Sequence, residues 1–192
     1  MSRFDHFNVI SPIYDLVFGK NTNLRILQFV DLEKQHSLLD IGGGTGRISQ
    51  HFLNQAKQVI IADSAKKMLG EAHRKGITGV NANSEALPFQ NDVFDWIIMV
   101  DAFHHVGDQQ RTIEEMWRSL APGGRLIIEE PDIRHWVVKL IALGEKLLLM
   151  RSHFRKPDEI INMMDFDDTD SIDLSTDMGI AWIRIKKKSI QK

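Results

Sequence analysis

The chain has 192 residues, of which 43% are hydrophobic and 26% charged, and its formal net charge is -2. This length and composition are typical of one globular domain, which we expect to span residues 1–192. The absence of cysteine excludes disulfides, thiolate metal ligands and a cysteine nucleophile. A net charge this close to zero gives no general attraction to nucleic acid or to an anionic membrane, so we expect neither as a partner.

The first residues show no basic region followed by an apolar core, so we expect no signal peptide and a cytoplasmic location. Residues 1–36 have helical features, and 24–32 predict a helix with one apolar face. The most apolar stretch of the chain, residues 136–150, is interrupted by charged side chains and is too short to span a bilayer.

Short apolar runs rich in Ile and Val predict buried strands at 37–41, 58–63, 77–82, 94–101 and 124–130. Stretches with helical features lie between several of these runs, at 47–56, 64–76 and 108–124. This alternation predicts right-handed βαβ units, and therefore an α/β fold with a doubly wound, mostly parallel sheet covered by helices on both faces.

Local signals set the expected ends of these elements. Ser64 is the expected cap of one helix, which closes at Gly76, and Asp108 is the expected cap of a helix that stops at 122–124. The core should then span 37–131. The C-terminal part, 132–192, should hold a long helix at 132–150, a short helix at 156–165, and two strands within 171–188 around a turn at 177–179.

The segment LLDIGGGTGRIS, residues 38–49, places four glycines directly after a predicted buried strand. Glycines permit positive φ and let a ligand approach the backbone closely, while a helix N-terminus favours an anionic group. The dinucleotide pattern G-x-G-x-x-G fails because Arg47 occupies its last position, and the phosphate loop G-x-x-x-x-G-K-[ST] fails as well. What remains is D-x-G-x-G-x-G at Asp40, Gly42, Gly44 and Gly46; the alternative is a tight turn with no ligand.

The second predicted strand ends in Asp63, 17 residues after Gly46. A carboxylate at this point can accept hydrogen bonds from a ribose diol. Nicotinamide-dependent proteins share this feature, so Asp63 alone does not show which ribose-containing cofactor would bind. The alternative role for Asp63 is that of a helix cap or a surface acid.

Four ordered segments resemble the motifs of the class I S-adenosylmethionine-dependent methyltransferases. They are the glycine loop, Asp63, the stretch NANSEALPFQNDVFDWIIMVDAFHHV at 81–106, and LAPGGRLIIEEP at 120–131. Residues 4–19, FDHFNVISPIYDLVFG, resemble the N-terminal entry of the ubiquinone/menaquinone-biosynthesis methyltransferase-like group, also called methyltransferase type 11. The resemblance implies a Rossmann-like, seven-stranded sheet with a C-terminal antiparallel hairpin and a helical lid at 1–36.

The same resemblance implies S-adenosyl-L-methionine as cofactor, S-adenosyl-L-homocysteine as product, and transfer of a methyl group to a small-molecule acceptor. The residues expected at the cofactor are Tyr14, Asp40, Gly42, Gly43, Gly44, Gly46, Asp63, Ser64, Asn83, Ser84, Asp101, Ala102 and Phe103. Asn83 stands where this group commonly has an acidic residue that reads the adenine amine. Its amide oxygen can still accept that hydrogen bond, in a neutral and therefore weaker contact.

The stretch VDAFHHVGD at 100–108 supplies the expected catalytic side chains, His104 and His105. Adjacent side chains on a strand point to opposite faces, so the two histidines should not share a metal ion, and we expect no metal site. At most one should face the acceptor, as a base or as a hydrogen-bond donor, and we expect this to be His104. Because the sulfonium already activates the methyl group, most of the catalysis should come from positioning the acceptor.

Other functions remain open. They include nucleic-acid or protein methylation, non-catalytic binding of S-adenosylmethionine, and a nicotinamide-dependent oxidoreductase that the glycine spacing disfavours. The apolar helix at 132–150 is either an ordinary core helix, one wall of a site for an apolar acceptor, or a contact with a second subunit in a homodimer.

Overall fold

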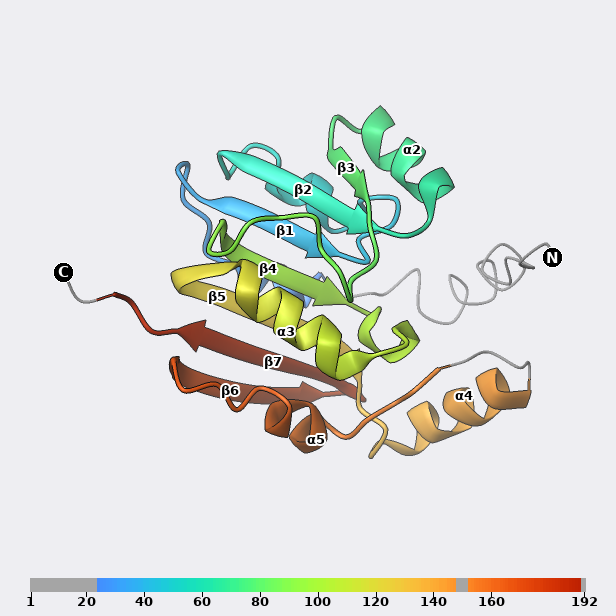
Figure 1. Ribbon diagram of the computed structural model, residues 1–192. Helices are drawn as coiled ribbons and strands as arrows, with labels where there is room; N and C mark the ends of the chain where they lie inside the picture. The colour runs from blue at the N-terminus through green and yellow to red at the C-terminus, as the bar shows by residue number, and fades with distance from the viewer. Residues whose placement is uncertain (1–23, 148–151, 191–192) are drawn as a thin grey trace.

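The computed structural model describes residues 24–147 and 152–190 (Figure 1). Its helices are η1 (Arg25–Gln28), η2 (Ser49–Phe52), α2 (Lys66–Arg74), η3 (Phe103–His105), α3 (Gln109–Ser119), α4 (Trp136–Leu147) and α5 (Pro157–Asn162), where η denotes a 3₁₀ helix. Its strands are β1 (Ser37–Ile41), β2 (Gln58–Asp63), β3 (Thr78–Asn81), β4 (Phe94–Val100), β5 (Leu120–Pro131), β6 (Thr169–Asp177) and β7 (Ile180–Lys187).

The seven strands form one sheet in the order β3-β2-β1-β4-β5-β7-β6. The first five are parallel to one another, and β7 runs antiparallel to β5 and to β6. The predicted doubly wound sheet with a C-terminal antiparallel hairpin is confirmed. The chain winds outward in one direction from β1 and in the other from β4, so a ligand crevice is expected where the carboxyl ends of these two strands meet.

Successive residues of the central strands enter two different cores, one on each face of the sheet. Leu39 and Ile97 pack with α3 and α5, whereas Leu38 and Ile98 pack with η1, η2 and α2. Figure 1 shows α3 in front of β4 and β5, and α2 beside β3. Burial on both faces explains why these strands read as continuous apolar runs.

Several expected helices are shorter in the structure. Residues 47–56 give only η2, because hydrogen bonds such as His51 N–H to the Ile48 carbonyl join residues three apart. The helix expected at 24–32 is reduced to η1. Of the helix expected at 132–150, α4 covers Trp136–Leu147, and residues 148–150 lie outside the described part of the chain.

The helix expected at 108–124 ends early. Asp108 caps α3 as predicted, accepting a hydrogen bond from the Arg111 N–H at 3.0 Å. However, α3 ends at Ser119 and β5 begins at Leu120, because Leu120 already pairs with Phe94 of β4. A shift in the pairing register after Phe94 accommodates the Pro-Gly-Gly stretch within β5.

Candidate active site

The glycine loop joins β1 to η2 at the carboxyl edge of the sheet. Gly42, Gly44 and Gly46 have φ of 71°, 53° and 75°, values that L side chains rarely adopt. A Cβ added to Gly42 would lie 2.7 Å from the Cβ of Ala102, which directly precedes η3. The glycines are therefore needed for the turn itself and for the close approach of the β1 and β4 ends.

Asp63, the last residue of β2, fastens this loop to the next helix. One carboxylate oxygen accepts the Gly44 N–H at 2.9 Å, and the other accepts the Ala65 N–H at 2.7 Å. Asp63 thus contributes the contact at the start of α2 that was expected of Ser64; the cap residue of α2 is Ala65, whose own side chain makes no capping hydrogen bond. Each carboxylate oxygen retains a second lone pair, so Asp63 can still accept hydrogen bonds from a diol.

Asp40 lies beneath the loop. Its side chain is 1% exposed and accepts the Ser49 hydroxyl at 2.6 Å, and a Cβ on Gly43 would come within 2.6 Å of the carboxyl group. Burial raises the pKa of Asp40 from 3.8 to about 7, aided by the nearby Asp63 charge and opposed by the Ser49 hydrogen bond and Arg47. The Asp40 side chain thus supports the loop from below, and its expected place at the cofactor stays a prediction.

The residues expected to read the adenine follow β3. Asn83 is exposed, and its side-chain oxygen accepts the Glu85 N–H at 3.2 Å. The Ser84 hydroxyl is 3.1 Å from the Thr112 hydroxyl of α3, so it turns toward the helix. Ser64 is exposed, and Tyr14 lies outside the described residues.

The turn after β4 corrects two expectations. Asp101 has φ of 52° and donates its N–H to the Glu129 carbonyl at 2.8 Å. Phe103 is 1% exposed and packs in the core with α3, so its ring does not face the crevice, where a cofactor neighbour was expected. His104 is also 1% exposed, whereas His105 keeps partial exposure; the expectation that His104 faces the acceptor is therefore wrong.

The two histidines lie side by side, with ring centroids 3.9 Å apart. Strand geometry predicts that they point to opposite faces, and this prediction is wrong because they belong to the 3₁₀ helix η3, in which consecutive side chains are about 120° apart. No group of His, Asp and Glu within 24–147 and 152–190 is arranged to hold a metal ion.

Glu130, near the carboxyl end of β5, organises this turn. One oxygen accepts the N–H groups of Ala102 at 3.0 Å and Phe103 at 2.7 Å, and the other lies 2.7 Å from Nδ1 of His104. The His104 tautomer that carries its proton on Nδ1 donates it to this Glu130 oxygen. The His104 ring also stacks on Phe154 at 4.4 Å, which leaves it fixed on several sides.

His105 is held near Ser152, whose hydroxyl is 3.3 Å from Nδ1. Burial, together with the adjacent His104, lowers the pKa of His105 to about 3. The imidazole is therefore neutral near pH 7, and it is suited to hydrogen bonding more than to storing a proton.

Glu129 is a functional candidate that the sequence reasoning missed. Its carboxylate accepts the Trp182 indole N–H at 2.6 Å, and burial, with added repulsion from Asp101 and Glu130, raises the pKa of Glu129 to about 7. A titratable group with a pKa near the working pH is what general acid–base chemistry requires. The available signal was two adjacent acids ending an apolar strand, LIIEEP at 126–131.

Acidic side chains gather at the carboxyl edge of the sheet, from the ends of β1, β2, β4 and β5. They are Asp40, Asp63, Asp101, Glu129 and Glu130. Mutual repulsion contributes to the raised pKa values of Asp40 and Glu129. Such an edge favours a cationic ligand, such as a sulfonium, and disfavours the pyrophosphate of a dinucleotide. The residues present therefore fit S-adenosylmethionine.

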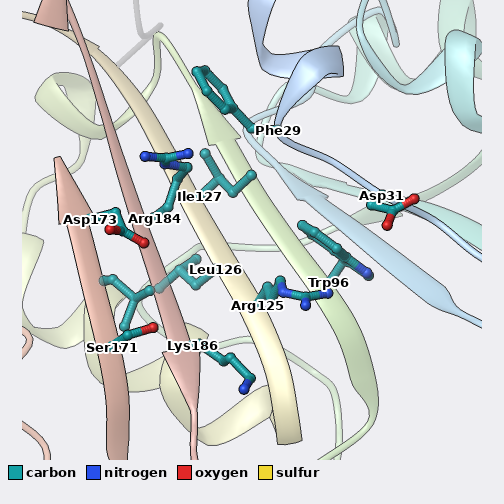
Figure 2. A pocket seen from close by; sticks show the side chains of 11 residues that line it. Phe29, Asp31, Trp96, Arg125, Leu126, Ile127, Ser171, Asp173, Arg184 and Lys186 are labelled. Atoms are coloured by element: carbon teal, nitrogen blue, oxygen red, sulfur yellow. The ribbon is translucent and has the colours of Figure 1, made fainter. Parts of the chain in front are cut away.

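A separate groove of about 390 Å³ crosses the sheet away from this edge (Figure 2). It is lined by β4, β5, β6 and β7 near the paired residues Trp96 and Arg125, toward the amino ends of β4 and β5. The Arg125 guanidinium lies over the Trp96 ring at 5.1 Å, and that of Arg184 lies over Phe29 at 4.6 Å. These contacts cover the ring of Trp96 on β4 and the ring of Phe29, which follows η1, so we assign the groove a structural role.

Comparison with known families fits this geometry. Residues 39–128, from β1 into β5, match the family model described as Methyltransferase domain. Residues 39–128 are therefore similar to a methyltransferase domain, over slightly less than half of the chain. The matched segment contains the glycine loop, Asp63 and the turn at 101–105.

Curated relatives of the methyltransferase domain are named ubiquinone/menaquinone biosynthesis C-methyltransferase. The one from Pasteurella multocida is 36% identical over 110 residues, and the one from Marinomonas sp. is 40% identical over 104 residues. These alignments cover 52% and 48% of this chain and 41% of each relative. The chain thus spans about two fifths of the length of the relatives it matches.

Solved structures share the fold of this protein along almost the whole chain. An S-adenosylmethionine-dependent methyltransferase from Thermotoga maritima matches with a TM-score of 0.82 at 20% identity, covering 96% of this chain and 98% of that one. A methyltransferase from Haloferax volcanii, solved with the Trm112 activator, matches with a TM-score of 0.79 at 14% identity, covering 97% and 100%. At these identities the likeness concerns the fold alone. Within the described ranges, every helix is too short or too polar to cross a membrane.

Proposed function

We propose that the protein transfers the methyl group of S-adenosylmethionine to a small-molecule acceptor. The observation that carries this proposal is the hydrogen bond between the glycine loop and Asp63. It holds a carboxylate that can also accept hydrogen bonds from a diol beside a close backbone turn at an acidic sheet edge. Bound there, the cofactor would supply an activated methyl group. The chain would contribute the geometry and the handling of the acceptor's proton.

The acceptor would lie against the turn at 101–105 and the start of the segment after β5. Glu130 fixes this wall through two backbone N–H groups and His104, so the wall is already arranged before any ligand binds. His105, neutral and partly exposed, would offer a hydrogen bond to the acceptor. Tyr14 and the expected helical lid belong to the same proposal, although residues 1–23 lie outside the described part of the chain.

Glu129 would receive the proton that the acceptor loses. Because the pKa of Glu129 is about 7, its carboxylate is ionised in part of the molecules at neutral pH. This carboxylate is also basic enough to accept a proton from the acceptor. His105 is a poorer base because its pKa is about 3. The names of the curated relatives favour a phenol- or quinol-type acceptor methylated at carbon. Glu129 would take the hydroxyl proton, a ring carbon of the resulting phenolate would take the methyl group, and loss of that carbon's proton with return of a proton to the oxygen would restore the aromatic ring.

Transfer of a labelled methyl group from S-adenosylmethionine to a panel of acceptors tests this proposal. The panel would contain simple quinols, the same rings with isoprenoid tails, catechols and small amines. We expect label on the ring carbon of quinols, as shown by mass spectrometry. Label only on amines would contradict the proposed class of acceptor. Absence of label on every acceptor would contradict the proposed methyl transfer, even if S-adenosylmethionine binds.

A further inference from the structure

Glu129 has a hydrogen-bonding partner on the neighbouring strand. Trp182 of β7 lies directly opposite Glu129 of β5 in the antiparallel register, so the two side chains lie on the same face of the sheet. The indole N–H of Trp182 donates to the Glu129 carboxylate at 2.6 Å, and both residues are buried. Because an indole N–H only donates, Trp182 holds the carboxylate without being able to take a proton from it.

The indole ring of Trp182 is itself held by η1 and the residue that follows it. The centroid of the Phe29 ring lies 5.8 Å from that of Trp182, and the Arg25 guanidinium carbon lies 5.8 Å from the centroid of the indole ring. Arg25 also pairs with Asp177 at the end of β6. These contacts fix the ring in the orientation that directs its N–H at Glu129.

The other groups that act on Glu129 are charged. Asp101, in the turn after β4, and Glu130, the next residue of β5, repel the ionised carboxylate, whereas Arg47, which follows the glycine loop, attracts it. Trp182 stabilises the ionised form through a hydrogen bond and adds no charge. A buried carboxylate beside two acids depends on such donors, because burial and repulsion both favour its protonated form.

We propose that Trp182 is the positioning residue of the base Glu129. Its indole N–H would bind one oxygen of the ionised carboxylate and fix its orientation, while the remaining lone pairs accept the hydroxyl proton of the acceptor. This inference rests on the proposed function, in which Glu129 takes that proton. The competing role for Trp182 is that of a core side chain whose hydrogen bond contributes to stability alone.

NMR of the wild-type protein without ligands tests the hydrogen bond. The indole N–H signal of Trp182 should shift with pH with a midpoint of about 7, because it reports the charge on its acceptor. Glu129→Gln should abolish this shift. Trp117 is the internal reference, since its indole N–H donates to Asp168 at 2.8 Å and its signal should not follow the titration of Glu129.

Turnover of Trp182→Phe, with the quinol that accepts the methyl group, tests the positioning role. The variant keeps an aromatic ring but loses the N–H, so the rise in kcat/KM should move to higher pH by about 1–2 pH units. The loss of kcat/KM should be about fivefold or more at pH 7 and should shrink toward pH 9. Trp117→Phe is the matched control, because it removes an equivalent bond between an indole and a carboxylate and should keep the wild-type pH dependence.

Melting curves of both tryptophan variants establish that they are folded. A Trp182 signal that does not follow Glu129, or a loss of turnover in Trp182→Phe that is equal at every pH, would overturn the positioning role and leave Glu129 as the base. If the Trp182 signal follows Glu129 but turnover of Glu129→Gln keeps its inflection, the hydrogen bond is real and the proposed base is wrong. The inference is then overturned together with that part of the proposed function.

Discussion

At the scale of single residues, the site is defined by carboxylates placed in unlike surroundings. Asp63 is held by backbone N–H groups and keeps acceptor capacity, while Asp40 and Glu129 are buried with pKa values near 7. On these differences we propose three roles: binding of a diol by Asp63, support of the loop by Asp40, and exchange of a proton by Glu129. Each role predicts a different response to substitution.

Removal of the Asp63 carboxylate should weaken cofactor binding. Asp63→Ala loses charge-assisted hydrogen bonds to the ribose, which we expect to cost roughly 1–3 kcal/mol in binding free energy. Calorimetric titration with S-adenosylhomocysteine measures the effect. Asp63→Asn, which keeps one acceptor, should fall between the alanine variant and the wild type, and an unchanged dissociation constant in both variants would remove Asp63 from the site.

Substitution of Glu129 should alter the pH dependence of turnover. Because the pKa of Glu129 is about 7, kcat/KM of the wild type should rise with pH through this value as the carboxylate ionises. Glu129→Gln should lose this rise and about 100-fold or more of the rate at pH 8. Glu130→Gln is the matched control; it should lower the rate but keep the inflection, and an inflection that survives in Glu129→Gln would exclude Glu129 as the base.

Substitution of Asp40 should change how stability depends on pH. The folded pKa of about 7 exceeds the ordinary value of 3.8, so the folded state binds the extra proton between about pH 4 and 7, and stability falls as pH rises through that window. Asp40→Asn keeps an acceptor for Ser49 but cannot ionise. Relative to the wild type, the variant should gain about 1–4 kcal/mol of unfolding free energy from pH 4 to pH 8, measured by urea denaturation; a constant difference would contradict the raised pKa.

At the scale of elements, the close contact between the β1 loop and the β4 turn determines the crevice. The glycine pattern and the buried strands could be predicted from sequence, because apolar runs and glycine turns have local causes. The pairing of Glu130 with the turn could not, since residues 102–104 and 130 are brought together only by the parallel pairing of β4 with β5. The histidine geometry was mispredicted because η3 was read as a continuation of the strand.

The loop contact itself can be tested with a small side chain. Gly42→Ala adds a methyl group at φ of 71° and 2.7 Å from Ala102, so we expect a loss of about 1–3 kcal/mol in unfolding free energy. Gly70→Ala is the control, because no atom lies within 4 Å of its added Cβ in α2; it should stabilise the protein by about 0.5–1 kcal/mol. Equal effects of the two substitutions would contradict a tight junction.

At the scale of the whole molecule, the carboxyl ends of the parallel strands, the turn at 101–105 and the start of α4 lie on one side of the sheet (Figure 1). The alternation of apolar runs and helical stretches predicts a doubly wound, mostly parallel sheet, and the C-terminal antiparallel hairpin was expected from the family resemblance. Which face of α4 stays uncovered was not, because an apolar helix looks the same in sequence whether its neighbours bury it or leave it open. We expect the choice of acceptor to depend on which side chains line the space around the turn at 101–105, and less on the glycine loop and Asp63.

The central claim is that this acidic, glycine-lined edge binds S-adenosylmethionine. Calorimetric titration of the full chain with S-adenosylmethionine, S-adenosylhomocysteine and NAD tests it most directly. The account predicts saturable binding of both sulfur compounds, one molecule per chain, and no heat with NAD. Heat with NAD alone, or none with either sulfur compound, would contradict it.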